Sequence, residues 1–204
     1  MGLISSTVSV SRYHVEGKFE DSVMESVKNG LVKHTIPAVE SEYDEILTGW
    51  TSYENPYSPD FETDPFVFGS YFLFSMRIDK KSVPLKLIQK HMAIETRKKL
   101  EQSGREFLSK NEKSELKDLV TDNLLRQVPS VPSIYDILWD YESSNLYLFS
   151  TQKAANEFFQ TLFVKSFDLK PFNLFPYTII ETKSGFSAPE KDDIYNLSLI
   201  KYSR

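Results

Sequence analysis

The chain has no cysteine, only three scattered histidines, no glycine-rich phosphate loop and no long apolar run. The absence of cysteine excludes a disulfide framework and a Cys-ligated zinc site. No apolar stretch reaches the roughly 18 residues that a membrane span requires. The first residues also lack the basic and apolar regions of a secretion signal. We therefore expect a cytoplasmic protein that has no membrane contact and needs no cofactor.

The composition is that of a folded chain with an uneven charge distribution. Its 204 residues are 40% hydrophobic and 14% aromatic, which is too high for a disordered chain. The net charge is −5, yet residues 77–118 hold 12 Lys/Arg against 7 Asp/Glu. This basic segment sits in an otherwise acidic chain, so any contact with a polyanion must be local.

Strand and helix patterns are interspersed along the chain. Alternating or clustered apolar residues predict strands over residues 7–15, 66–78 (with Gly69 as a bulge), 133–141, 145–149, 166–169, 177–180 and 197–202, and a strand or turn at 47–50. Helical spacing predicts helices over residues 21–34, 85–102 and 151–164, and one after Ser109. Residues 53–64 have no period and predict a loop. Such an order favours an α+β fold with mixed or antiparallel sheets and packed helices.

We expect one unit over residues 1–204, with room for two subdomains, one of about residues 1–80 with 134–204 and one helical segment of residues 84–127. Trp50 and Trp139 are predicted core residues, as is the inward face of the helix over residues 151–164, namely Ala155, Phe158, Phe159, Leu162 and Phe163.

The helical segment carries clear start and stop signals. Pro84 suits a first helical turn, and Ser103-Gly104 a helix end. Ser109 and Glu112 form a capping box, which begins a second helix. Its predicted buried face is Leu116, Leu119, Val120 and Leu124.

The first of these two helices has two chemically different sides. Leu85, Ile88 and Met92 share one side, which we expect to pack. Lys86, Lys90 and Arg97 fall within about 40° of one another on a different side. Cations spaced in this way suit phosphate contacts. The predicted DNA-binding residues are these three together with Lys80, Lys81 and Lys98.

Two stretches carry a family resemblance. They are DKKSVPLKLIQKHMAIETRKKLEQSGREFLSKNEKSELKDLVTDNLL and ILWDYESSNLYLFSTQKAANEFFQTLF. Taken in order, they closely resemble the recombination-associated RdgC family over roughly residues 77–176. The chain ends at Arg204, whereas typical members carry a further C-terminal region that helps to close a ring. It therefore resembles a shortened homologue.

The resemblance implies a non-enzymatic, nucleoid-associated protein that binds duplex DNA with little sequence preference. It also implies a homodimeric ring with a basic inner surface and a link to recombination and replication restart. Residues 126–132 are proline-rich where relatives place Arg and Phe, so the resemblance does not decide whether a closed ring forms.

Other interpretations remain open beside DNA binding. The basic stripe is also what a solvated helix face looks like, and the chain could be a protein–protein module that has lost DNA binding. Pro59-Asp60 followed by Asp79-Lys80-Lys81 loosely fits a Mg²⁺ nuclease, in which two carboxylates hold the metal. Asp60, Glu62 and Asp64 more simply fit solvated loop acids.

Overall fold

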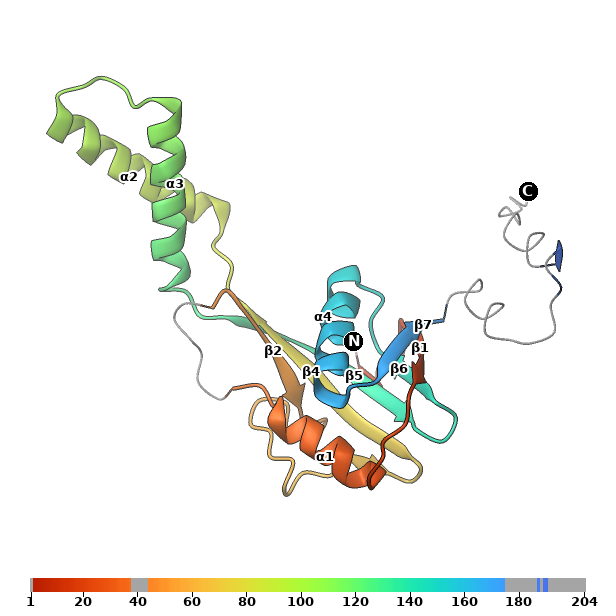
Figure 1. Cartoon of the computed structure of the whole chain (residues 1–204). Helices are drawn as coiled ribbons and strands as arrows, with labels where there is room; N and C mark the ends of the chain where they lie inside the picture. The colour runs from red at the N-terminus through yellow and green to blue at the C-terminus, as the bar shows by residue number, and fades with distance from the viewer. Residues whose placement is uncertain (1, 38–43, 175–186, 188, 191–204) are drawn as a thin grey trace. The chain divides into compact units, whose positions relative to one another are not determined.

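The structure is a computed structural model that describes residues 2–37, 44–174, 187 and 189–190 (Figure 1). Within these residues there are four helices: α1 Val23–Lys33, α2 Leu85–Ser103, α3 Lys110–Leu125 and α4 Lys153–Phe167. The strands of the same residues are β1 Ser11–Glu16, β2 Ile46–Thr51, β3 Val67–Phe68, β4 Tyr71–Lys80, β5 Val131–Asp140, β6 Asn145–Leu148 and β7 Lys170–Asn173.

The described strands form one antiparallel sheet in the order β2-β4-β5-β6-β1-β7, with β3 paired to β4. The β5–β6 hairpin places Trp139 opposite Leu146, and β1 pairs with both β6 and β7. The α+β prediction is confirmed. The predicted strands over residues 177–180 and 197–202 lie outside the described residues.

The chain divides into two compact units. The sheet unit comprises Met1–Thr35, Trp50–Met76 and Tyr135–Arg204, and the helical unit comprises Ile36–Gly49 and Arg77–Ile134. The boundary falls within β2, β4 and β5, so each of these strands contributes residues to both units.

An aromatic cluster forms the core of the sheet unit. Trp50, Trp139, Phe159 and Phe163 are fully buried, as both tryptophan predictions required. Their rings pack edge-on or tilted at centroid separations between 5.2 and 6.4 Å, a geometry that adds to the hydrophobic effect. The Trp50 indole also donates to Ser166 Oγ at 2.7 Å.

Three strand predictions fail in instructive ways. Gly69 is not a bulge: it has φ +63° and begins a two-residue turn between β3 and β4. The strand predicted over residues 166–169 is the end of α4, because Phe163 and Phe167 extend the buried face by one turn. Asp168, at φ 54°, then ends the helix. β1 starts only at Ser11, because its partner β6 is four residues long.

In the helical unit, α2 and α3 pack around a small core. Leu108, Leu116, Val120 and Leu124 are buried there, and the partly buried residues against them are Val83, Leu87, Ile88, Met92 and Leu100. Two predictions of burial are wrong, since Leu85 is 63% and Leu119 55% exposed. Leu119 lies about 100° around the helix from Val120, outside the arc that α2 covers.

Candidate nucleic-acid interface

The exposed side of α2 carries the predicted cations. Lys86, Lys90 and Arg97 are all exposed, and they lie away from Ile88 and Met92, which face the core of the helical unit. With a rise of about 1.5 Å per residue, the three cations extend over roughly 16 Å. That length corresponds to about five base pairs at 3.4 Å each. The three residues, called the α2 stripe below, can therefore contact several phosphates at once.

Two of the predicted cations form ion pairs within α2. Arg97 Nε lies 2.8 Å from Glu101 Oε1, and Lys98 Nζ lies 2.7 Å from Glu95 Oε1. All four side chains are more than a third exposed, with Arg97 at 83%. Exposed pairs of this kind are worth only about 0.3–0.5 kcal/mol, so little free energy is needed to break them. A phosphate can therefore displace these carboxylates.

The two lysines that follow Asp79 differ in their surroundings. Lys80, the last residue of β4, is exposed. Lys81 is buried, with 7% of its surface exposed, and its backbone N–H donates to the Glu45 carbonyl at 2.9 Å. A lysine that is buried in this way cannot contact a phosphate of DNA. We therefore remove Lys81 from the predicted set.

Helix α3 adds three exposed lysines that the sequence reasoning missed, Lys110, Lys113 and Lys117. Their spacing of three and four residues places them within about 60° of one another on the helix. This spacing could have been read from the sequence. The α3 lysines raise the number of exposed cations in the helical unit.

The start of α3 is fixed by local chemistry. Ser109 Oγ accepts from the Glu112 N–H at 3.3 Å, and Glu112 Oε2 accepts from the Ser109 N–H at 2.8 Å, which confirms the capping box. Arg105 Nη2 donates to Glu112 Oε1 at 2.8 Å. The bonds from Ser109, and then that from Arg105, lower the pKa of Glu112 to about 2. The carboxylate therefore stays ionised and holds the helix start in place.

The carboxylates considered for a Mg²⁺ site accept hydrogen bonds from protein groups instead. Asp79 is 3% exposed and is held by Arg77, through Nε to Oδ1 at 2.8 Å and Nη2 to Oδ2 at 2.6 Å. Asp60 accepts from the Glu62 N–H and the Thr63 hydroxyl within its own loop. Over the described residues, no three His, Asp or Glu side chains gather as metal ligands would.

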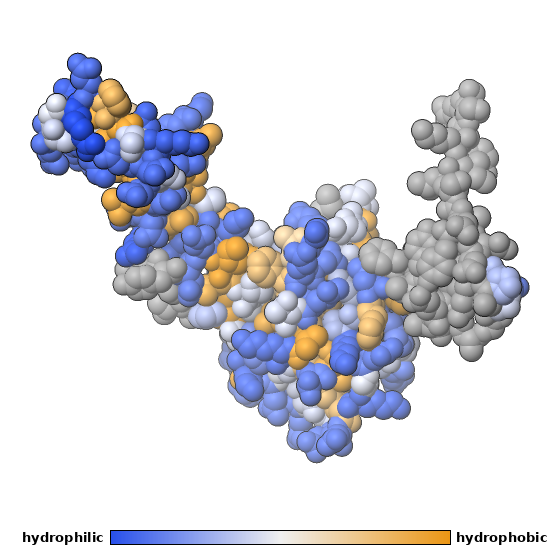
Figure 2. Space-filling model, turned by 45° about the horizontal axis from the view of Figure 1, so that its top comes forward, coloured by the Kyte–Doolittle hydropathy of each residue, from blue (hydrophilic) through white to orange (hydrophobic). Residues whose placement is uncertain are grey.

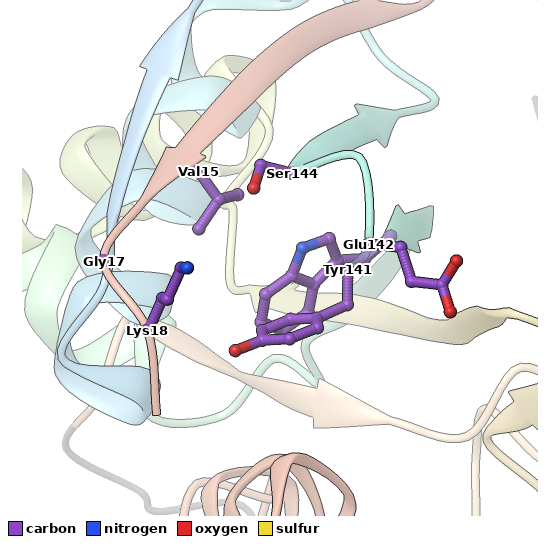
Figure 3. Close-up of a pocket in the computed structure, with 7 residues that line it drawn as sticks. Val15, Gly17, Lys18, Tyr141, Glu142 and Ser144 are labelled. Carbon is purple, nitrogen blue, oxygen red and sulfur yellow. The ribbon is translucent and has the colours of Figure 1, made fainter. Parts of the chain in front are cut away.

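A hollow in the sheet unit lies beside the aromatic core. Figure 3 shows Val15 and Lys18 facing Tyr141 across it, while the carboxylate of Glu142 points away. Trp139 also lines it, and in the described part of the chain its indole N–H has no hydrogen-bond partner. The volume of about 270 Å³ is below the roughly 300–1,000 Å³ of most ligand pockets. We assign no ligand to it.

Comparison with known proteins identifies the family. The profile described as "Putative exonuclease, RdgC" matches residues 10–184. The chain belongs to the RdgC family. The resemblance drawn from residues 77–176 is thereby confirmed, and the matched range includes the α2 stripe and the Trp139 hairpin. No curated protein matches the chain.

Membership of the RdgC family supports a general DNA- and recombination-associated role. In the part of the chain that the structure describes, no helix is both long enough and apolar enough to cross a bilayer.

Proposed function

We propose that this RdgC-family chain binds duplex DNA without sequence preference, through the α2 stripe assisted by Lys80 and Lys98. In this proposal it acts as a cytoplasmic, nucleoid-associated homodimer in recombination or replication, and it has no enzymatic activity. The observation that carries the proposal is the exposure of Lys86, Lys90 and Arg97 along one side of α2, away from its packed side.

The chemistry of this surface supports backbone contact rather than base readout. Lysine and arginine bind phosphates through charge, which releases counterions and is independent of sequence. Base readout needs side chains aimed at donor and acceptor patterns in a groove. The stripe instead consists of cations spaced along one helix. The non-enzymatic part is supported by Asp79, whose carboxylate is occupied by Arg77.

The direct test is binding of a labelled random-sequence duplex, followed by fluorescence anisotropy between about 50 and 200 mM salt. We expect affinity that falls steeply with salt and that unrelated duplexes compete for equally. No binding at about 50 mM salt would overturn the proposal and leave the protein–protein module. Duplex cleavage that requires Mg²⁺ and disappears in Asp79→Ala would contradict the non-enzymatic part.

A further inference from the structure

The helical unit also carries an apolar groove with an acidic rim. Its volume is about 860 Å³, and it is formed by the start of α2, by α3 from its middle to its end, and by Glu45. The residues that line it are Glu45, Leu85, Ile88, Glu115, Lys117, Asp118, Leu119, Thr121, Asp122 and Leu125. We call it the α2–α3 groove. Four carboxylates against one lysine make its lining acidic.

Two large apolar side chains of the groove are exposed. Leu85 and Leu119 are 63% and 55% exposed, and Ile88 connects them to the core of the helical unit. Figure 2 shows apolar residues (orange) among hydrophilic ones (blue) on the helical unit, at the upper left. Contiguous apolar surface with a polar rim is typical of a protein-binding site.

The charge of the rim is largely uncompensated. Asp122 is paired with Arg126 at 3.0 Å. Among the described residues, no ion pair within 4.0 Å engages Glu45, Glu115 or Asp118. A polyanion would be repelled from this rim, whereas a cationic partner would be attracted to it.

We propose that the α2–α3 groove binds a basic amphipathic helix of another protein. Such a helix would place apolar side chains on Leu85, Ile88 and Leu119, and its lysines or arginines beside Glu45, Glu115 and Asp118. This is the helix-in-groove mode of recognition, with apolar anchors at helical spacing. The proposal adds a protein partner to a unit whose α2 stripe is assigned to DNA.

A second copy of the chain is the less suitable occupant. The basic surfaces that it offers are the α2 stripe and the exposed lysines of α3, one of which, Lys117, lines the groove itself. Docking on the stripe would cover the cations assigned to DNA. The choice of a foreign partner over a second copy therefore rests on the proposed function. On α2 itself, Leu85 and Ile88 lie about 100–180° around the helix from the stripe residues, so a helix in the groove leaves the stripe accessible.

The test uses the whole 204-residue chain and a fluorescein-labelled designed peptide of about five helical turns, with leucines along one face and lysines elsewhere. A peptide with glutamate in place of every lysine is its control. DNA is left out of this assay because the lysine peptide would bind it directly. We expect the lysine peptide to bind and the glutamate peptide not to bind. Leu119→Ser should weaken binding of the lysine peptide about tenfold, because about half the burial of one leucine is lost.

Two matched variants make the result specific. Glu115→Gln with Asp118→Asn is expected to weaken peptide binding and reduce its salt dependence. Ile94→Ser, on the stripe side of α2 and 42% exposed, is expected to change nothing. Equal affinity for the Leu119→Ser and Ile94→Ser proteins would overturn the proposal, because attraction would then be to net charge alone.

Sedimentation equilibrium separates the remaining outcomes. Self-association that Leu119→Ser abolishes, without peptide binding, would assign the groove to a second copy and refute the foreign partner. Leu119→Ser should keep the melting temperature, since the residue is exposed, and should keep duplex affinity. Peptide binding by a protein that fails to bind DNA would leave the groove assignment standing and refute only the proposed function.

Discussion

Replacing Lys86, Lys90 and Arg97 together with alanine should change the salt dependence of duplex binding by a calculable amount. Each neutralised phosphate contributes about 0.9 to the slope of log K against log salt. Three exposed cations on one helix face then contribute about 2.7. Between 50 and 200 mM salt, the wild type should lose about 40-fold more affinity than the triple variant.

The ion pair of Arg97 sets a lower bound on this effect. If Glu101 stays paired with Arg97 in the complex, two cations remain and the slope changes by about 1.8. Glu101→Gln in the wild-type protein distinguishes the two cases. If phosphate displaces Glu101 in the complex, this change should raise the affinity for duplex DNA about twofold, because the pair that phosphate no longer has to break is worth about 0.3–0.5 kcal/mol.

A matched control removes the same charge from the sheet unit. Lys153, Lys165 and Lys170 are exposed, and changing all three to alanine should leave the slope unchanged. The assay is fluorescence anisotropy with a random duplex at four or more salt concentrations. Parallel slopes for wild type and stripe variant, or an equal loss in the control, would refute the assignment of the α2 stripe to DNA.

Four further predictions concern stability and are measured by urea unfolding followed by circular dichroism. Ser109→Ala should destabilise the protein by about 1 kcal/mol, because α3 loses its cap. The folded-state pKa of Glu112, about 2, lies below its ordinary 4.5, so this carboxylate should contribute fully to the stability above about pH 4.5 and progressively less as the pH falls to 2. This pH-dependent loss of stability should vanish in Glu112→Gln. Gly104→Ala should cost about 1 kcal/mol, because φ is +65° while no atom lies within 4 Å of the added Cβ; an unchanged stability would contradict the left-handed helix end. Asp79→Ala should destabilise the protein by about 1.5–3 kcal/mol, the range for a hydrogen bond to a charged group, because the Arg77 guanidinium loses the bonds that it donates to this buried carboxylate. The loss should be equal in Mg²⁺ and in EDTA, whereas a loss seen only with Mg²⁺ would point to a metal ligand.

The features that were predicted correctly depend on neighbours close in sequence. The capping box joins Ser109 and Glu112 three residues apart, and the helix end at Gly104 requires one residue with positive φ. Both follow from backbone chemistry that a short window contains. The β5–β6 hairpin, with Trp139 facing the core, is local in the same sense.

The features that were missed divide into two kinds. Some were readable: Arg97 with Glu101 is an i,i+4 pair on a helix, and Arg77 with Asp79 is an i,i+2 pair on one face of a strand. The burial of Lys81 was not readable, since its backbone bonds to Glu45, 36 positions earlier in the chain. Whether Leu119 is covered likewise depends on which arc of α3 meets α2, a tertiary property.

The two proposals for the helical unit are compatible because of the distance over which charge acts. The α2 stripe and the α2–α3 groove use different sides of α2, about 100–180° apart around the helix, and a helix with its side chains is about 10–12 Å across. The Debye length is about 8 Å at physiological salt, so DNA on the stripe is largely screened from Glu115 and Asp118. At 0.01 M salt it is about 30 Å, and the acidic rim then repels the duplex. Neutralising that rim by Glu115→Gln and Asp118→Asn should therefore strengthen DNA binding at low salt and leave it unchanged at physiological salt. A rim that contacted the duplex directly would affect binding under both conditions.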